Sequence, residues 1–201
     1  MASLMAALKH AAKNRNYLRK NVVFCFQPGE EGKGGANKLF KLKPDLLESI
    51  QECYAIHFYN GMYPGTVALG KGPVTAHSSR FFIEIEGKST HCMAPQGGID
   101  ANFIGCQLVG QLYSLIGLKV PPLHGATLVV YKISGGGEAA KVSNKFELAA
   151  TIKVTTTLDF QKLEKTITDL THNLSSAYDA KANIRFITGN QSLMQIYTGQ
   201  F

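Results

Sequence analysis

Residues from about 78 to 186 alternate between strand-type and helix-type patterns in one fixed order. Four segments have the period-two alternation or the β-branched composition of strands: 81–85, 127–133, 146–154 and 184–186. Two segments repeat apolar residues at helical spacing: 104–115 and 160–174. The order β-α-β-β-α-β predicts a ferredoxin-like α+β sandwich, with a four-stranded sheet and two helices.

The first 75 residues predict a different unit of mixed α/β character. An apolar stripe from Leu4 to Ala12 indicates a helix, and a short helix is expected from about Ala36. Apolar runs predict strands at 21–26 and 53–58, and a short extended piece is expected at 66–69. The two strands could be parallel neighbours in an open sheet.

Glu30 and Glu31 follow the predicted strand 21–26, directly after Pro28-Gly29. Open α/β sheets bind ligands at the C-terminal ends of their strands. Two adjacent carboxylates beside a core strand cost energy unless a cation or a proton offsets their repulsion. One carboxylate could bind a metal ion while the other acts as a base. A solvated pair of loop carboxylates is the alternative that these two residues leave open.

His57 lies near the C-terminal end of the predicted strand 53–58. If the two strands are parallel neighbours, His57 and the Glu30-Glu31 loop come out at the same edge of the sheet. A carboxylate and an imidazole together suit zinc, manganese or a similar ion. The alternative is a structural histidine at a strand end.

Six motifs resemble, in order, those of the two-domain metal-dependent amidohydrolases. They are 26–35 (FQPGEEGKGG), 55–57 (AIH), 64–67 (PGTV), 72–74 (GPV), 87–95 (GKSTHCMAP) and 98–101 (GIDA). This group includes hippurate hydrolase, indole-acetyl-amino-acid hydrolases and N-acetyl-diaminopimelate deacetylase, with aminoacylases and metallo-carboxypeptidases as relatives. The resemblance covers essentially the whole chain.

The resemblance implies a role for four residues. Glu30 would be the general base, Glu31 and His57 would be metal ligands, and the cofactor would be two divalent ions, zinc or manganese. A divalent cation lowers the pKa of a bound water, and a nearby carboxylate can then take its proton. His91 would reach from a lid domain into the partner subunit's site and stabilise the oxyanion. Without the resemblance, His91 reads as a loop histidine that caps the helix following 98–100.

The resemblance also implies a domain plan: residues 1–76 as part of a catalytic metal-binding domain, 77–190 as a lid or dimerisation domain, and 191–201 as the return into the catalytic domain. The resembled enzymes carry further metal ligands in a Cys/His loop upstream of the first helix and in a histidine near their C-terminus. This sequence has no counterpart of either, so the chain is expected to be an internal fragment. Lys141 stands where the resembled enzymes carry an asparagine that meets the substrate, unless Asn144 replaces it.

The expected function is metal-dependent hydrolysis of the amide bond of N-acyl amino acids. The alternative is an inactive fragment or homologue that acts as a dimerisation or binding module. The expected partners are a small N-acyl amino acid and a second copy bound through the lid. A nucleic-acid partner is not expected, although the net charge is +7, because the strands carry no stacking aromatics of the RNA-recognition type.

Composition fits a globular chain, with 45% hydrophobic and 17% charged residues. No apolar run approaches the roughly 20 residues of a membrane span, and no signal peptide is visible, so no membrane partner is expected. Four cysteines without CxxC spacing, with Cys25 in a core-like run, predict reduced thiols and a cytoplasmic location.

Overall fold

A computed structural model describes residues 1–29, 35–69, 72–73, 75–188 and 194–195. Glu30 and Glu31 lie outside the described residues. The chain divides into two compact units, Met1–Thr66 and Val67–Phe201, and each is described by itself.

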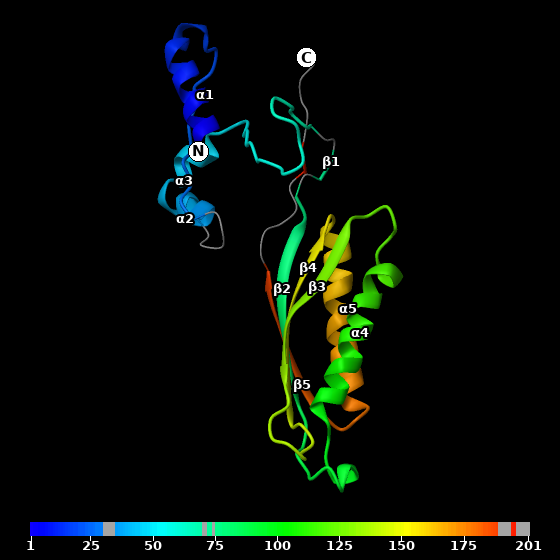
Figure 1. Ribbon diagram of the computed structural model, residues 1–201. Coiled ribbons are helices and arrows are strands. Elements are labelled where there is room, and N and C mark those ends of the chain that lie inside the picture. Colours follow the sequence, from blue (N-terminus) through cyan, green and yellow to red (C-terminus); the bar gives the residue numbers. More distant parts are fainter. Residues whose placement is uncertain (30–34, 70–71, 74, 189–193, 196–201) are drawn as a thin grey trace. The chain divides into compact units, whose positions relative to one another are not determined.

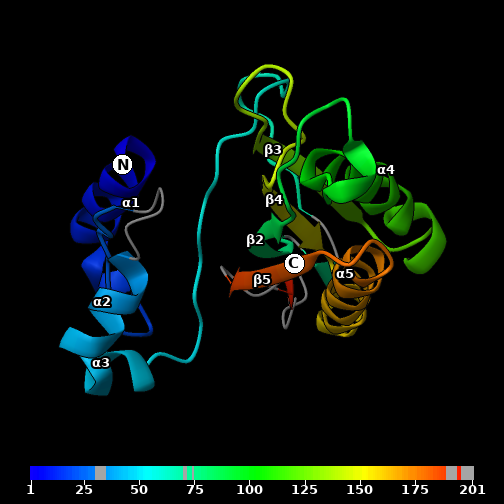
Figure 2. The same ribbon diagram turned by 90° about the horizontal axis from the view of Figure 1, so that it is seen from below.

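The second unit contains a four-stranded antiparallel sheet in the order β3-β4-β2-β5. Its strands and helices follow the chain as β2 (His77–Glu86), α4 (Ala101–Lys119), β3 (Ala126–Gly135), β4 (Lys145–Val154), α5 (Thr157–Ser176) and β5 (Lys181–Thr188). Both helices cover the same face of the sheet (Figure 1, Figure 2). The predicted β-α-β-β-α-β order is confirmed.

The core of this unit lies between the sheet and the two helices. Phe81, Ile83 and Ile85 point to the helices from alternate positions of β2 and are at most 2% exposed. The remaining fully buried large side chains come from α4, β4 and α5: Ile104, Leu108, Leu112, Phe146, Leu148, Ile152, Val154, Leu163 and Ile167. The alternation in the strands and the helical spacing in α4 and α5 therefore bring these side chains together in one continuous apolar layer between the sheet and the helices.

Side chains cap the N-termini of both core helices. Asp100 accepts hydrogen bonds from the amides of Asn102 and Phe103, at 2.9 and 3.2 Å, at the start of α4. The Thr156 hydroxyl accepts from the Asp159 amide at 3.0 Å at the start of α5. The alternative reading of His91 as the cap of α4 is therefore wrong, because Asp100 fills that position.

Among the described helices, α4 alone has the length and hydropathy of a membrane span, with 19 residues and a mean hydropathy of 1.2. Its six buried residues pack toward the sheet: Ala101, Ile104, Gly105, Leu108, Leu112 and Leu115. Gly105 is required there, because a Cβ atom at this position would lie 2.4 Å from the ring of Phe146. These contacts identify α4 as a core helix of the second unit.

The first unit consists of helices and irregular chain. Its helices are α1 (Ala2–Lys13), the 3₁₀ turn Arg15–Tyr17, α2 (Gly35–Leu42) and α3 (Pro44–Glu48). The helices predicted over 4–12 and from Ala36 are confirmed. In the second unit, two-residue strands β1 (Gly72–Pro73) and β6 (Met194–Gln195) pair antiparallel.

The strands predicted at 21–26 and 53–58 are wrong for the described structure, because neither segment is in a strand. Val22 is 52% exposed and Ile56 is 78% exposed. A strand needs the backbone of a neighbour to satisfy its amides, and the described part of this unit offers no paired strand. Cys25 is likewise exposed rather than core-like, and all four cysteines are free.

Candidate functional site

The loop that carries His91 is held by backbone hydrogen bonds to the loop between β3 and β4. Segment 87–101 joins β2 to α4, and segment 136–144 joins β3 to β4, at the same end of the sheet (Figure 1). Four bonds tie them: Gly87 N to Asn144 O at 2.9 Å, Val142 N to Thr90 O at 2.9 Å, Cys92 N to Ala140 O at 2.8 Å, and Ala101 N to Ser143 O at 2.9 Å. The position of His91 is therefore fixed by strand-like backbone pairing between the two loops.

His91 and Lys141 are directly opposite each other in an antiparallel bridge. The bonds on either side belong to the flanking residues, so this is a non-hydrogen-bonded pair, in which side chains stand on the same face and closest together. Both side chains are exposed. The two loops thus present an imidazole and an ammonium group side by side to solvent.

The ring of His91 is oriented by a backbone amide. The Met93 N–H donates to Nδ1 of His91 at 3.2 Å. An N–H donor requires a lone pair on Nδ1, so in the neutral ring Nε2 carries the proton. The loop therefore leaves an Nε2–H donor available to an oxygen acceptor.

Lys141 already binds a carboxylate within its own loop. Its ammonium lies 2.5 Å from Glu138 Oε2, and the two side chains are 50% and 74% exposed. An ion pair this exposed is worth little, so another carboxylate can replace Glu138 at small cost. Asn144, considered as a replacement for the expected asparagine, accepts a bond from Gly87 through its backbone oxygen, and its side chain is exposed.

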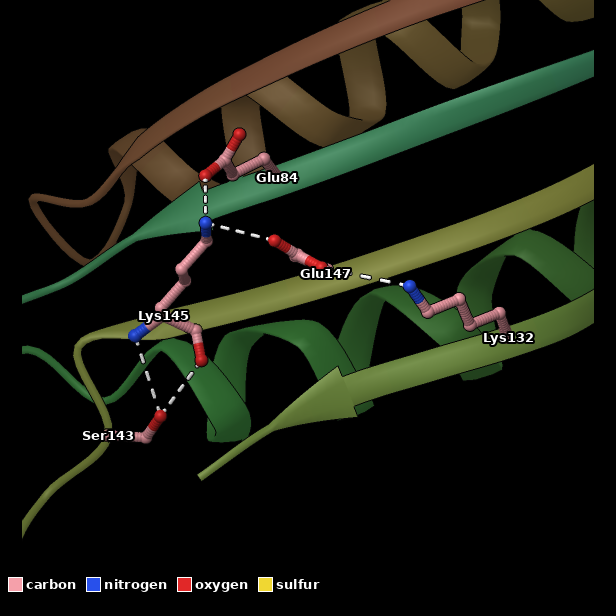
Figure 3. Close-up of polar contacts among 5 residues, drawn as sticks. All are labelled: Glu84, Lys132, Ser143, Lys145 and Glu147. Carbon is pink, nitrogen blue, oxygen red and sulfur yellow. Dashed lines mark hydrogen bonds and ion pairs between the residues drawn. The ribbon is translucent and has the colours of Figure 1, made fainter. Parts of the chain in front are cut away.

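A ladder of charged side chains runs across the first residues of β4 (Figure 3). The Lys145 ammonium lies 2.7 Å from Glu84 and 2.9 Å from Glu147, and Lys132 lies 4.0 Å from Glu147. The hydrogen bond to Glu84, followed by that to Glu147, raises the pKa of Lys145. The hydrogen bond from Lys145 lowers the pKa of Glu147. Lys145 therefore ties β4 to the central strand β2 beside the His91 loop.

His57 belongs to the first unit and is exposed. Its Nδ1 lies 2.7 Å from the carbonyl oxygen of Phe58. A carbonyl oxygen can only accept, so Nδ1 carries the proton and Nε2 keeps a lone pair suited to a metal ion. No group of three or more His, Cys, Asp or Glu side chains able to hold a metal ion occurs in the part of the chain that the structure describes.

The remaining histidines include one contact that the sequence did not reveal. His10 and His172 are exposed. His124 is also exposed, and its Nδ1 lies 2.6 Å from Oδ2 of Asp159, which is 4% exposed. The Thr156 hydroxyl, which donates to Asp159 at 2.6 Å, is the main reason that the pKa of this carboxyl is lowered. The Thr-x-x-Asp spacing at 156–159 was the available signal for this cap.

His77, close to the domain junction in the sequence, is the first residue of β2 and is 3% exposed. Its ring stacks on Phe160 with centroids 4.0 Å apart. Neither ring nitrogen has a hydrogen-bond partner. His77 is therefore a packing residue of the second unit.

The family model described as Peptidase family M20/M25/M40 matches residues 1–191. The chain belongs to this family, as the motif resemblance predicted.

Three curated relatives each share 29% identity with the chain. They include an N-acetyl-L-cysteine deacetylase of Bacillus subtilis, over 94% of this chain and 45% of that protein. An IAA-amino acid hydrolase of Arabidopsis thaliana matches over 92% and 41%. An N-acetyldiaminopimelate deacetylase of a Geobacillus strain matches over 92% and 49%. The chain therefore spans about half the length of the curated relatives that it matches.

Solved structures share the fold. The Bacillus subtilis YXEP protein, described as a dinuclear metal binding peptidase of the M20 family, matches with a TM-score of 0.78 at 21% identity. The match covers 97% of this chain and 48% of the YXEP chain. A tripeptidase of Staphylococcus aureus has a TM-score of 0.55 at 18% identity, over 66% and 35%. The predicted fold class, an α/β metallopeptidase-type architecture with a ferredoxin-like α+β domain, is confirmed.

Proposed function

We propose that this protein takes part in metal-dependent hydrolysis of the amide bond of N-acyl amino acids. The observation that carries the proposal is the exposed His91 ring, whose Nδ1 accepts from the Met93 amide and whose Nε2–H is therefore left as a donor. Such a donor suits the oxygen of an amide carbonyl, which gains negative charge as the bond is attacked. The deacetylase and hydrolase relatives support the same reaction class.

The proposed roles follow the domain plan that the sequence motifs imply. Residues 1–76 contribute to a catalytic domain and 77–190 form the lid, with 191–201 returning to the catalytic domain. Glu31 and His57 would hold divalent ions, zinc or manganese and two in number, and the Nε2 lone pair of His57 fits that role. Such ions lower the pKa of a water molecule when bound. Glu30 takes the proton from the attacking water, and His91 donates to the carbonyl oxygen in the site of a partner copy.

The test is release of free amino acid from N-acetyl amino acids, with Zn²⁺ or Mn²⁺ added after chelation. Because the chain spans about half the length of its relatives, the transcript is first sequenced on both sides of the reading frame, and any longer in-frame polypeptide is assayed. We expect release that depends on the metal and falls about 100-fold or more in His91→Ala. His172→Ala, an exposed histidine on α5, is the control. Metal-loaded protein without release contradicts the proposal.

A dimerisation module is the second candidate function. The observation that favours it is that every large apolar side chain buried in the described structure belongs to the lid. We propose a homodimer through the open edge of β3, where Val129, Tyr131 and Ile133 are 48%, 52% and 55% exposed. Light scattering at rising concentration should show a dimer that Ile133→Lys weakens. Ile187→Lys, on the opposite edge strand β5, is the matched control. A monomer at every concentration contradicts the dimer.

We also propose a cytoplasmic location, which the four free, exposed cysteines support. Nucleic acid and membrane are not proposed as partners.

A further inference from the structure

The conformation of the loop between β3 and β4 is not fixed by its own sequence. It begins with Gly136-Gly137, directly after Gly135 at the end of β3, and Gly136 has a φ of 85°. Ala140 also adopts a left-handed φ, of 62°, which an alanine rarely does. Glycine-rich chain with such angles needs hydrogen bonds to hold one shape. The loop that faces His91 must therefore be fixed by specific contacts.

The hydroxyl of Ser143 supplies these contacts. It accepts from the amide of Gly136 at 3.2 Å and from the amide of Lys145 at 3.4 Å, and it donates to the carbonyl of Lys145 at 2.9 Å (Figure 3 shows the two Lys145 contacts). A serine hydroxyl has one donor and two acceptor positions, so all three are used. One side chain thus joins the beginning of the loop to its end.

The same residue is also attached to the His91 loop. The carbonyl of Ser143 accepts from the amide of Ala101, and its neighbour Val142 donates to Thr90, both at 2.9 Å. On the far side, Lys145 is anchored to Glu84 and Glu147 in the sheet. Ser143 therefore connects the start of β4, which is anchored in the sheet, to the segment that pairs with His91.

We infer that Ser143 is a positioning residue for His91: its hydroxyl closes the 136–144 loop in the one register that places Lys141 opposite His91. Without the hydroxyl, the Gly136 amide loses its acceptor and the loop gains conformations in which 140–142 separates from 90–92. The inference rests on the proposed function only for its catalytic consequence, because the geometry concerns the loop alone.

The first test measures amide hydrogen exchange at Cys92 and Val142, the two donors that flank the His91–Lys141 pair. In Ser143→Ala we expect exchange at both amides to be at least tenfold faster and the His91 ring resonances to shift. Ser143→Thr, which keeps a hydroxyl, should restore both. Ser114→Ala, which removes a hydroxyl bonded to Gly110 O on α4, is the control and should change neither.

The exchange of Ile83, in the central strand, separates local from global effects. Unchanged exchange at Cys92 and Val142 overturns the inference. Faster exchange that extends to Ile83 also overturns it, and so does faster exchange that Ser143→Thr does not reverse. In either case the hydroxyl would have no specific local role.

The second test uses the active enzyme. We expect kcat to fall about tenfold in Ser143→Ala, because the oxyanion donor is displaced, and KM to rise by no more than about fivefold, because Lys141 moves with the same loop. An unchanged kcat overturns the positioning role while leaving the proposed function intact. If wild-type protein releases no amino acid, the proposed function fails, and the exchange experiment still decides the inference.

Discussion

His91 and Lys141 form a non-hydrogen-bonded antiparallel pair, bracketed by the bonds Cys92 N to Ala140 O and Val142 N to Thr90 O. This pairing brings together two residues that are 50 positions apart in the sequence. It gives the lid a hydrogen-bond donor with a cation beside it. A negatively charged substrate suits that combination.

Replacing Lys141 tests whether this cation recognises the substrate carboxylate. In Lys141→Met we expect KM for N-acetyl amino acids to rise about two- to fivefold, which corresponds to roughly 0.4–1 kcal/mol for an exposed charge pair. KM for the matching N-acetyl amino acid amides, which lack the carboxylate, should not change. Lys165→Met, an exposed lysine on α5, is the control. Equal effects on both substrate classes would show that Lys141 does not read the carboxylate.

Replacing Glu30 tests the proposed general base. Glutamine keeps the size of the side chain but cannot take a proton, so in Glu30→Gln we expect kcat to fall by about 10²–10⁴. The amount of bound metal, measured by elemental analysis, should stay the same. Glu48→Gln, on helix α3, should leave both quantities unchanged. Retained turnover in Glu30→Gln would exclude Glu30 as the base.

Two glycines on α4 test the packing of the lid. A Cβ at Gly105 meets the Phe146 ring at 2.4 Å, whereas one at Gly110 meets nothing within 4 Å. Gly105→Ala should lower the free energy of unfolding by about 1–3 kcal/mol through overpacking. Gly110→Ala should raise it by up to about 1 kcal/mol, because alanine favours the helix. Urea unfolding of the two variants gives the comparison, and equal stabilities would contradict the packing of α4 on β4.

Asp159 should make the lid sensitive to acid. Hydrogen bonding by Thr156, together with His124, lowers the pKa of this carboxyl below its unfolded value. A lowered folded-state pKa contributes stability above the unfolded pKa, which is about 4, and this stability is lost as the pH falls through the folded pKa. We therefore expect the melting temperature of wild type to fall below about pH 4.

The matched variants isolate this carboxyl. Asp159→Asn should be less stable than wild type at neutral pH, and the difference should shrink as the pH approaches about 2. Asp169→Asn, half-exposed on the same helix, should keep the wild-type profile. A constant difference between Asp159→Asn and wild type at every pH would exclude ionisation of Asp159 as the source.

The lid could be predicted from the sequence because its signals are local. Phe81, Ile83 and Ile85 alternate along a strand, and Leu108 and Leu112 recur along a helix, so each residue's burial follows from its own segment. The segments predicted as strands at 21–26 and 53–58 have equally apolar sequences. They are not strands, because pairing depends on a neighbouring backbone that a segment cannot supply by itself.

The sequence alone determined the order of elements in the lid, the family motifs and the choice of His91 as a candidate donor, since each is written in a short run of residues. The tertiary structure alone decided that Lys141 stands opposite His91, that Met93 orients the ring and that Ser143 closes the loop. These contacts join distant residues through a glycine-rich segment without periodicity. Its backbone is fixed by hydrogen bonds to other parts of the fold and not by local preference.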